Sequence, residues 1–276
     1  MRSRALVIVP LVLVLGLGVG LGVYLGTRHS PGSTAAGRTT ESRRTTPKPR
    51  RAIGPHDRPV PILMYHVIAV APADAPYPNL FVSPGRFRKQ VSYLARHGYR
   101  GVTLDEVWAH WRHCEPLPRN AVVISFDDGF GSWHRVAFPV LERRGWLGTM
   151  NLALSHLNGI DVRRRWMRKL IRAGWELDSH TLTHADLTSL GSDVLRNEVA
   201  GSRRRLQRIF HVPVHFFCYP SGRYNDRVIA AVQEAGYRGA TTTIEGLATP
   251  DARYTLKRVR VNGDDSPAEV YEHVRA

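Results

Sequence analysis

Short apolar, β-branched segments alternate with amphipathic helical segments from residue 59 onward, and this repeat constrains the fold more than any other feature. Repeated βα units imply a parallel sheet, either open or closed. The number and length of the strands favour an α/β domain built as a distorted (β/α) barrel of seven or eight strands, complete or incomplete. Strands are predicted at 60–65, 121–126, 148–154, 213–219, 238–243 and 256–261, with weaker ones near 100–104 and 175–179.

The helices between these strands have ends that are readable in the sequence. Ser83 caps the first helix, Pro84 opens it and Gly98 ends it. No glycine-rich phosphate-binding loop follows a strand, which argues against a nucleotide-binding sheet. Further helices are predicted at 132–144, 162–173, 192–210 and 225–235.

The N-terminal residues 1–26 are interpreted as a membrane anchor. An apolar run at residues 5–26 follows Arg2 and Arg4 and is long enough to cross a bilayer as a helix. We expect an uncleaved anchor rather than a signal sequence, because no clear small-residue cleavage site follows the run. Because Arg2 and Arg4 precede the run, we expect the N-terminus in the cytoplasm and the following domain outside the cell membrane. If the segment is cleaved, the protein is secreted.

Residues 27–58 are rich in Ser, Thr, Pro, Gly and Arg, so we expect a disordered linker before a folded domain at 59–276. Up to Arg58 the chain holds ten Lys/Arg and two Asp/Glu, which is +8 of its total charge of +16. This distribution favours a solvated segment near an anionic surface over nucleic-acid binding. Cys114 and Cys218 are predicted at opposite ends of the strands, so no disulfide is expected.

Unusual polar residues stand at four predicted strand ends, where a (β/α) barrel carries its chemistry. Adjacent carboxylates, Asp127 and Asp128, close one apolar strand. His180 and His184 follow another strand at the spacing of one helical turn, so both rings can point the same way. Two imidazoles and a carboxylate form a set that binds a divalent cation and leaves positions open for water and substrate. The other ends carry His66 and the turn Tyr219-Pro220-Ser221-Gly222.

The two aspartates are expected to have separate roles. One can ligate the cation, which lowers the cost of ionising its neighbour. The other can stay unligated and act as a base toward water. An Asx-turn at Gly129 is the structural alternative, but it accounts for one carboxylate and not for both.

Together these residues resemble the polysaccharide deacetylase family (NodB homology, carbohydrate esterase 4). Phe126-Asp127-Asp128-Gly129 is similar to the first motif of the family, and SHTLTH at residues 179–184 to its second. The turn at 219–222 resembles a variant of the third motif, and the resemblance spans residues 60–261. The stretches PILMYHVI and PYPNLFVSPGRF are further similar to the extracellular poly-N-acetylglucosamine deacetylase branch.

The resemblance implies one divalent cation, usually zinc (Zn²⁺), held by Asp128, His180 and His184, with Asp127 as the catalytic base. It implies hydrolysis of N-acetyl groups on an extracellular amino-sugar polysaccharide. The turn formed by Tyr219, Pro220, Ser221 and Gly222 would contact the substrate, and a backbone N–H near Ser221 would hold the oxyanion.

Three departures from the family pattern leave roles open. Cys218 stands where the third motif has an arginine that orients the base, and Ser221 stands where a tyrosine is common. The late Leu-x-His motif is absent, since YTLKRVRV offers Lys257 and Arg258 there. In the biofilm-type branch the corresponding histidine lies early, which makes His66 the candidate general acid; a core histidine is the alternative.

Several further residues have two interpretations each. Asp178 alternates with His180 on one strand face, either supporting that imidazole or facing solvent. Trp166 and Trp175 are expected to pack helices on the barrel, with a sugar contact at the rim as the alternative. Trp133 follows the aspartate pair and either stacks on a sugar or packs in the core.

Three functions therefore remain open. The favoured one is a membrane-tethered, metal-dependent de-N-acetylase of biofilm-type poly-N-acetylglucosamine, with a monomeric catalytic domain and no nucleic-acid partner. The second keeps the chemistry but acts on peptidoglycan, chitin or an O-acetyl ester. The third is a non-catalytic glycan binder, which the missing arginine supports and the intact Asp127 opposes, because a binder needs no separate base.

Overall fold

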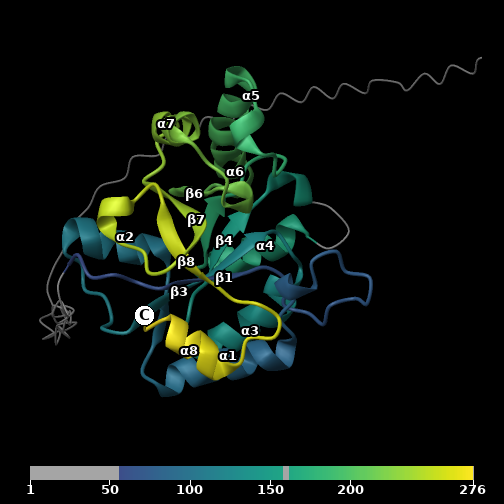
Figure 1. Cartoon of the computed structure of the whole chain (residues 1–276), viewed down its shortest axis with the longest axis vertical. Coiled ribbons are helices and arrows are strands. Elements are labelled where there is room, and N and C mark those ends of the chain that lie inside the picture. Colours follow the sequence, from purple (N-terminus) through teal and green to yellow (C-terminus); the bar gives the residue numbers. More distant parts are fainter. Residues whose placement is uncertain (1–55, 158–161, 276) are drawn as a thin grey trace, which may run out of the picture. The chain divides into compact units, whose positions relative to one another are not determined.

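Eight parallel strands form the sheet of the domain, and the sheet closes on itself into a barrel (Figure 1). A computed structural model describes residues 56–157 and 162–275 of the chain. The order of strands is β1-β8-β7-β6-β5-β4-β3-β2, and an additional pairing of β1 with β3 closes seven strands and leaves β2 beside β3. The predicted barrel is thus confirmed as seven closed strands with an eighth alongside. The strands are β1 (Ile62–Tyr65), β2 (Arg100–Val102), β3 (Ala121–Asp128), β4 (Thr149–Leu152), β5 (Glu176–Ser179), β6 (Phe216–Cys218), β7 (Gly239–Glu245) and β8 (Leu256–Arg260).

The helices lie mainly where the sequence predicts them. Ser83 caps α1 by accepting a hydrogen bond from the backbone N–H of Arg86 (3.3 Å). The predicted helices at 132–144 and 192–210 are interrupted, because each contains a π-helical turn, at Trp133–Ala137 and Asn197–Gly201. The helices are α1 (Pro84–Arg96), α2 (Leu104–His113), α3 (Phe138–Glu142), α4 (Arg164–Arg172), α5 (Ser192–Arg196), α6 (Ser202–Phe210), α7 (Asp226–Glu234) and α8 (Pro267–His273).

Two helices, α2 and α8, were not predicted, although both begin with a capping box. Thr103 and Glu106 form this reciprocal pair in α2, and Ser266 and Glu269 form it in α8. Trp108 and Trp111 of α2 belong to the same buried cluster as residues of the barrel strands. This helix therefore covers one end of the barrel.

Alternation along the strands separates two apolar clusters. Val122, Ile124 and Phe126 of β3 belong to an outer cluster that packs against the helices. Val123 of β3 belongs instead to a smaller cluster with Phe216 of β6, although β4 and β5 lie between these strands in the sheet. Side chains from strands that are not neighbours can meet only inside the barrel. The inward face of β3 therefore continues from Val123 through Ser125 to Asp127.

The predicted anchor at 1–26 lies outside the described residues, as does the predicted linker except for residues 56–58. Within the part of the chain that the structure describes, no helix combines the length and apolar character needed to cross a membrane.

Candidate active site

Asp127 lies at the carboxyl end of β3 and points into the barrel. Its carboxylate is paired with Arg258 of β8 by two hydrogen bonds, Nη1 to Oδ1 (2.8 Å) and Nη2 to Oδ2 (2.7 Å). Asn151 of β4 donates a third bond to Oδ1 (2.8 Å). Asp127 is 2 % exposed and Arg258 is 0 % exposed, so the pair is shielded from solvent. A bidentate pair of this kind fixes the orientation of the carboxylate as well as its charge.

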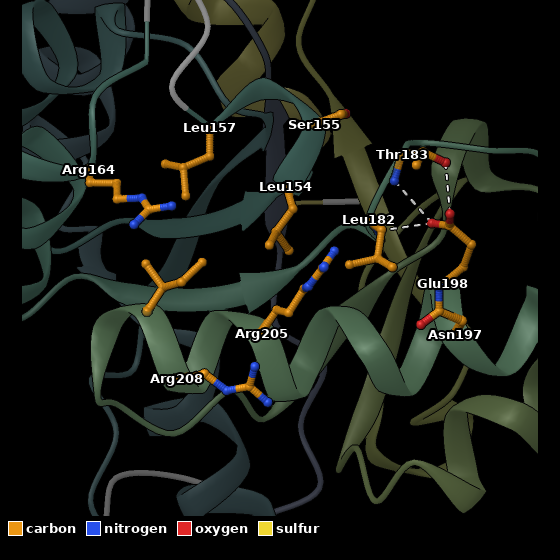
Figure 2. Close-up of a pocket in the computed structure, with 11 residues that line it drawn as sticks. Leu154, Ser155, Leu157, Arg164, Leu182, Thr183, Asn197, Glu198, Arg205 and Arg208 are labelled. Carbon is orange, nitrogen blue, oxygen red and sulfur yellow. Dashed lines mark hydrogen bonds between the residues drawn. The ribbon is translucent and has the colours of Figure 1, made fainter. Parts of the chain in front are cut away.

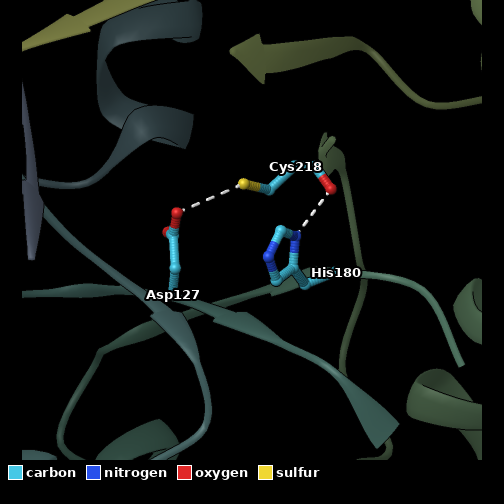
Figure 3. Close-up of side chains that lie close together, drawn as sticks. All are labelled: Asp127, His180 and Cys218. Atoms are coloured by element: carbon cyan, nitrogen blue, oxygen red, sulfur yellow. Dashed lines mark hydrogen bonds between the residues drawn. The ribbon is translucent and has the colours of Figure 1, made fainter. Parts of the chain in front are cut away.

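The guanidinium of Arg258 is itself held on every nitrogen. Its Nε donates to the Thr242 carbonyl (2.7 Å), and Nη1 also donates to Ser125 Oγ (3.3 Å). Nη2 lies 3.4 Å from Cys218 Sγ, and this thiol donates to Asp127 Oδ2 (3.6 Å; Figure 3). The small side chain of Cys218 thus leaves room for an arginine that enters from another strand.

Arg258 is the residue that the sequence interpretation missed. The third motif lacks its arginine at Cys218, but a guanidinium from β8 lies against Asp127 in its place. The available signal was the alternation of β8, which puts Arg258 on the same inward face as the buried Leu256. A charged side chain on the inward face of a buried strand requires an ionic partner.

The charge of Arg258 determines the ionisation of Asp127. Burial opposes ionisation, but the charge and hydrogen bonds of Arg258 outweigh it and hold the pKa of Asp127 well below its usual value. Asp127 is consequently an ionised, fixed acceptor at neutral pH.

Asp128, His180 and His184 converge beside this pair. Asp128 Oδ1 lies 3.4 Å from His180 Nε2 and 3.3 Å from His184 Nε2, and all three ligand atoms lie within 4.8 Å of one another. Ligands bound tetrahedrally at zinc distances of about 2.0–2.1 Å are separated by roughly 3.3–3.4 Å. The spacing and the donor types therefore fit a zinc ion.

A hydrogen bond also sets His180 up as a ligand. Its Nδ1 lies 2.7 Å from the carbonyl oxygen of Cys218, which can only accept (Figure 3). The neutral imidazole therefore carries its proton on Nδ1, and the lone pair of its Nε2 is directed at the Asp128 side. Cys218 thus contacts the base through its thiol and a candidate ligand through its backbone.

The loop that carries the two histidines is not the helical turn that their spacing predicts. Thr181 and His184 have φ values of 71° and 61°, which no α-helix allows. The reason lies in side-chain acceptors: Thr181 Oγ1 accepts the His184 N–H (2.8 Å), and Glu198 accepts those of Leu182 (2.9 Å) and Thr183 (3.0 Å). These bonds replace the helical ones and still bring both rings to Asp128.

His66 follows β1 and is partly exposed at the same end of the barrel. Burial lowers the pKa of its imidazole, and the nearby Asp127 and Asp128 oppose this effect only in part. The indole of Trp133 donates to the His66 carbonyl (2.9 Å) and fixes the backbone there. Trp133 is fully buried, so its interpretation as a sugar-stacking residue is wrong.

The turn after β6 offers backbone rather than aromatic contacts. The Tyr219 side chain is fully buried, stacks on Tyr224 at 5.0 Å and donates to the Tyr254 carbonyl (3.0 Å). Pro220 is also buried, whereas Ser221 is exposed and has φ 52°. A Cβ on the next residue, Gly222, would lie 2.0 Å from Thr243 Oγ1, so only glycine fits there. Any contact of this turn with a substrate must therefore come from its backbone or from Ser221.

Other interpretations are also resolved. Asp178 is fully buried and accepts from the Phe216 N–H (2.9 Å), so it neither supports His180 nor faces solvent. Cys114 and Cys218 are both free thiols, which confirms that no disulfide joins them. Trp175 is buried and stacks on Phe126 at 5.4 Å, as expected of a packing residue.

Comparisons with known proteins agree with the geometry. The family model described as polysaccharide deacetylase matches residues 115–240. YxkH of Bacillus subtilis (strain 168), which its name assigns to the polysaccharide deacetylases, is 30 % identical over 207 residues, 74 % of this chain and 71 % of that protein. The poly-beta-1,6-N-acetyl-D-glucosamine N-deacetylase of Staphylococcus epidermidis is 25 % identical over 205 residues, 67 % of this chain and 70 % of that protein.

Solved structures extend this similarity to the fold. The Streptococcus pyogenes deacetylase PplD, solved in complex with acetate, superposes with a TM-score of 0.74 at 27 % identity and covers 79 % of this chain and 99 % of its own. The fold, the similarity of sequence over most of both chains and the shared motifs together lead to one conclusion. The chain belongs to the polysaccharide deacetylase family, a family of hydrolases.

Proposed function

We propose that this protein removes N-acetyl groups from an extracellular N-acetylglucosamine polysaccharide, with a divalent cation held by Asp128, His180 and His184. The observation that carries the proposal is the division of labour between the two aspartates. Asp127 is locked to Arg258 (2.7 and 2.8 Å), and Asp128 faces the two imidazoles (3.3 and 3.4 Å). A glycan binder has no need of a fixed base beside a ligand set.

A cation in this ligand set supplies Lewis-acid polarisation of the acetyl carbonyl and favours the ionisation of an attacking water. Two imidazole nitrogens and one carboxylate oxygen are ligands that suit zinc, and they leave a position open for substrate. We expect zinc for this reason.

The residues of the chain then carry out the proton transfers. Asp127 accepts a proton from the water as the water oxygen bonds to the acetyl carbon. Arg258 keeps the Asp127 carboxylate ionised and fixes its orientation. A backbone N–H near Ser221 donates to the developing oxyanion. His66 in its protonated form gives a proton to the sugar nitrogen as the C–N bond breaks; its lowered pKa makes that imidazolium a stronger acid. The products are acetate and the free amine.

Arg258 also weighs against the non-catalytic alternative. The best argument for a binder was the missing arginine at Cys218, and a bidentate guanidinium from β8 now provides what that arginine would provide. The name of the Staphylococcus epidermidis relative supports a β-1,6-linked polymer as substrate. We further propose that residues 1–26 anchor the enzyme with its domain outside the cell membrane.

A substrate panel tests this function. The zinc-loaded full chain is incubated with acetylated β-1,6-glucosamine oligomers, chitin oligomers, peptidoglycan fragments and O-acetylated sugars, and mass spectrometry counts the acetyl groups lost. We expect loss from N-acetylated glucosamine oligomers, abolished by a chelator and by Asp127→Asn. Absence of loss from every amino sugar would refute the proposal, and loss confined to O-acetyl esters would replace it with an esterase.

A further inference from the structure

A second concave region lies between α4 and α6, outside the barrel (Figure 2). It is a pocket of about 600 Å³ whose lining combines apolar side chains with polar ones, three arginines among them. Figure 2 shows Arg164 reaching in from α4 and Arg205 from α6, with leucines between them. We call this region the arginine groove, defined by Arg164, Arg205 and Arg208 together with the apolar residues Leu154, Leu157, Leu182 and Ile209.

Within the described residues, no ion pair neutralises the three arginines of the groove. Among the ion pairs of residues 56–157 and 162–275, none involves Arg164, Arg205 or Arg208. Glu198 also lines the groove, but its carboxylate accepts hydrogen bonds from Leu182 N (2.9 Å), Thr183 N (3.0 Å) and Thr183 Oγ1 (2.8 Å). The Glu198 carboxylate is thus bound by Leu182 and Thr183 and forms no ion pair with the three arginines.

The net charge of the domain is concentrated in the two helices that flank the groove. Residues 162–173 and 202–211 contain ten Lys/Arg and no Asp/Glu, whereas residues 59–276 as a whole contain 29 Lys/Arg and 21 Asp/Glu. Outside these two stretches the domain is therefore slightly acidic. Arg168 of α4 donates to the Ile209 carbonyl of α6 (3.2 Å) and ties the two basic helices together. A charged concave surface of this kind attracts anions.

The groove adjoins the candidate metal site. Leu182 and Thr183 line it, and they lie in the chain between His180 and His184. The backbone N–H of Ser155 donates to the Leu182 carbonyl (2.7 Å), which links the two loops behind the ligands. The groove lining thus includes a residue, Leu182, within two positions of both imidazole ligands in the chain.

We propose that the arginine groove binds carboxylate groups of the polymer on which the enzyme acts, so that carboxylated N-acetylglucosamine polymers are preferred to neutral ones. This inference rests on the proposed function. Guanidinium forks match carboxylates in geometry, and the leucines offer an apolar floor to the C–H faces of sugar rings. The volume lies within the usual range of ligand pockets. A groove favours a strand over a flat bilayer.

Binding and turnover together test this inference. The binding probe is fluorescent oligogalacturonate, which is carboxylated but carries no acetamido group, and its anisotropy is followed at about 0.02 M and about 0.2 M salt. Polyphosphate, dextran and phosphatidylglycerol vesicles are measured in parallel. The variant R205E/R208E is compared with R88E/K89E, a matched control that makes the same charge change on exposed residues of α1.

We expect oligogalacturonate to bind the wild type, with a Kd that rises with salt. R205E/R208E should weaken this binding roughly tenfold, and R88E/K89E by less than about twofold. The preference in kcat/KM for a carboxylated over a neutral acetylated oligomer should fall about tenfold in R205E/R208E. Circular dichroism checks folding, and R205Q/R208Q gives a milder second test.

Other results would overturn the inference. Equal weakening by both charge-reversal pairs would show general electrostatics rather than a groove. Binding of polyphosphate or vesicles without oligogalacturonate would assign the surface to a phosphate polymer or a membrane. Failure of the proposed function is distinct, because a neutral acetylated oligomer would then lose no acetyl group while oligogalacturonate still bound.

Discussion

Replacing Arg258 with methionine probes the account most deeply, because it removes a charge and keeps much of the volume. In the wild type the pKa of Asp127 is held well below its usual value, so the ionised carboxylate stabilises the native state. Arg258 and Asp127 are buried, and breaking such a pair by removing one partner costs about 3–5 kcal/mol. We expect Arg258→Met to reduce the free energy of unfolding at neutral pH by an amount in this range.

The pH dependence should change sign for this group. With its pKa depressed, the wild-type carboxylate contributes stability above the unfolded value of about 3.9, and the contribution disappears as the pH falls through the folded pKa. Without Arg258, burial raises the pKa of Asp127 above the unfolded value. The folded state then favours the neutral acid, and this contribution to stability is lost as the pH rises from the unfolded pKa through the raised folded pKa. Urea unfolding of chelator-treated protein from acid to neutral pH measures both trends.

Arg258→Lys is the matched control, because lysine keeps the charge but cannot make the bidentate contact. Arg258→Lys should retain most of the stability that the ionised Asp127 contributes above its unfolded pKa. Its kcat/KM should still fall roughly a hundredfold, because the orientation of Asp127 is no longer fixed. If Arg258→Met left both the unfolding free energy and its pH dependence at wild-type values, the reasoning about this pair would be refuted.

Three further predictions concern the candidate site. Asp127→Asn should retain bound zinc and lose roughly 10²–10⁴-fold in kcat, measured by acetate release; loss of zinc would place Asp127 among the ligands instead. His184→Ala should weaken zinc binding at least about tenfold in a competition titration, and unchanged affinity would exclude it as a ligand. Gly222→Ala should destabilise the fold by about 1–3 kcal/mol in thermal unfolding, because its φ of 68° is strained for alanine and the new Cβ meets Thr243; an unchanged unfolding temperature would contradict the close approach.

The sequence was sufficient to predict the barrel and most of its site. All eight strands lie at the predicted segments, because period-two alternation and β-branched residues are local signals. Parallel strands bring their carboxyl ends to one edge, so the motif residues at separate strand ends could be expected to converge. Asp127, Asp128, His180 and His184 do lie together.

Arg258 could not be assigned from local patterns, because its pairing depends on closure of the barrel. β8 and β3 are separated by β1, and only the β1–β3 pairing brings the guanidinium across the interior to Asp127. The loop at 181–184 has a similar cause, since Glu198 supplies acceptors from another element. Trp133 begins a π-helical turn and is buried in the outer cluster, where its indole donates to the His66 carbonyl; residue spacing does not reveal this turn.

Acetate release by zinc-loaded wild type and Asp127→Asn, each assayed at a known metal content, tests the central claim most directly. The claim is that Asp128, His180 and His184 hold the cation while Asp127, aimed by Arg258, moves the proton. It predicts one zinc per chain in both proteins and acetate from acetylated glucosamine oligomers with the wild type alone. Equal acetate release by both proteins, or none from a fully loaded wild type, would contradict it.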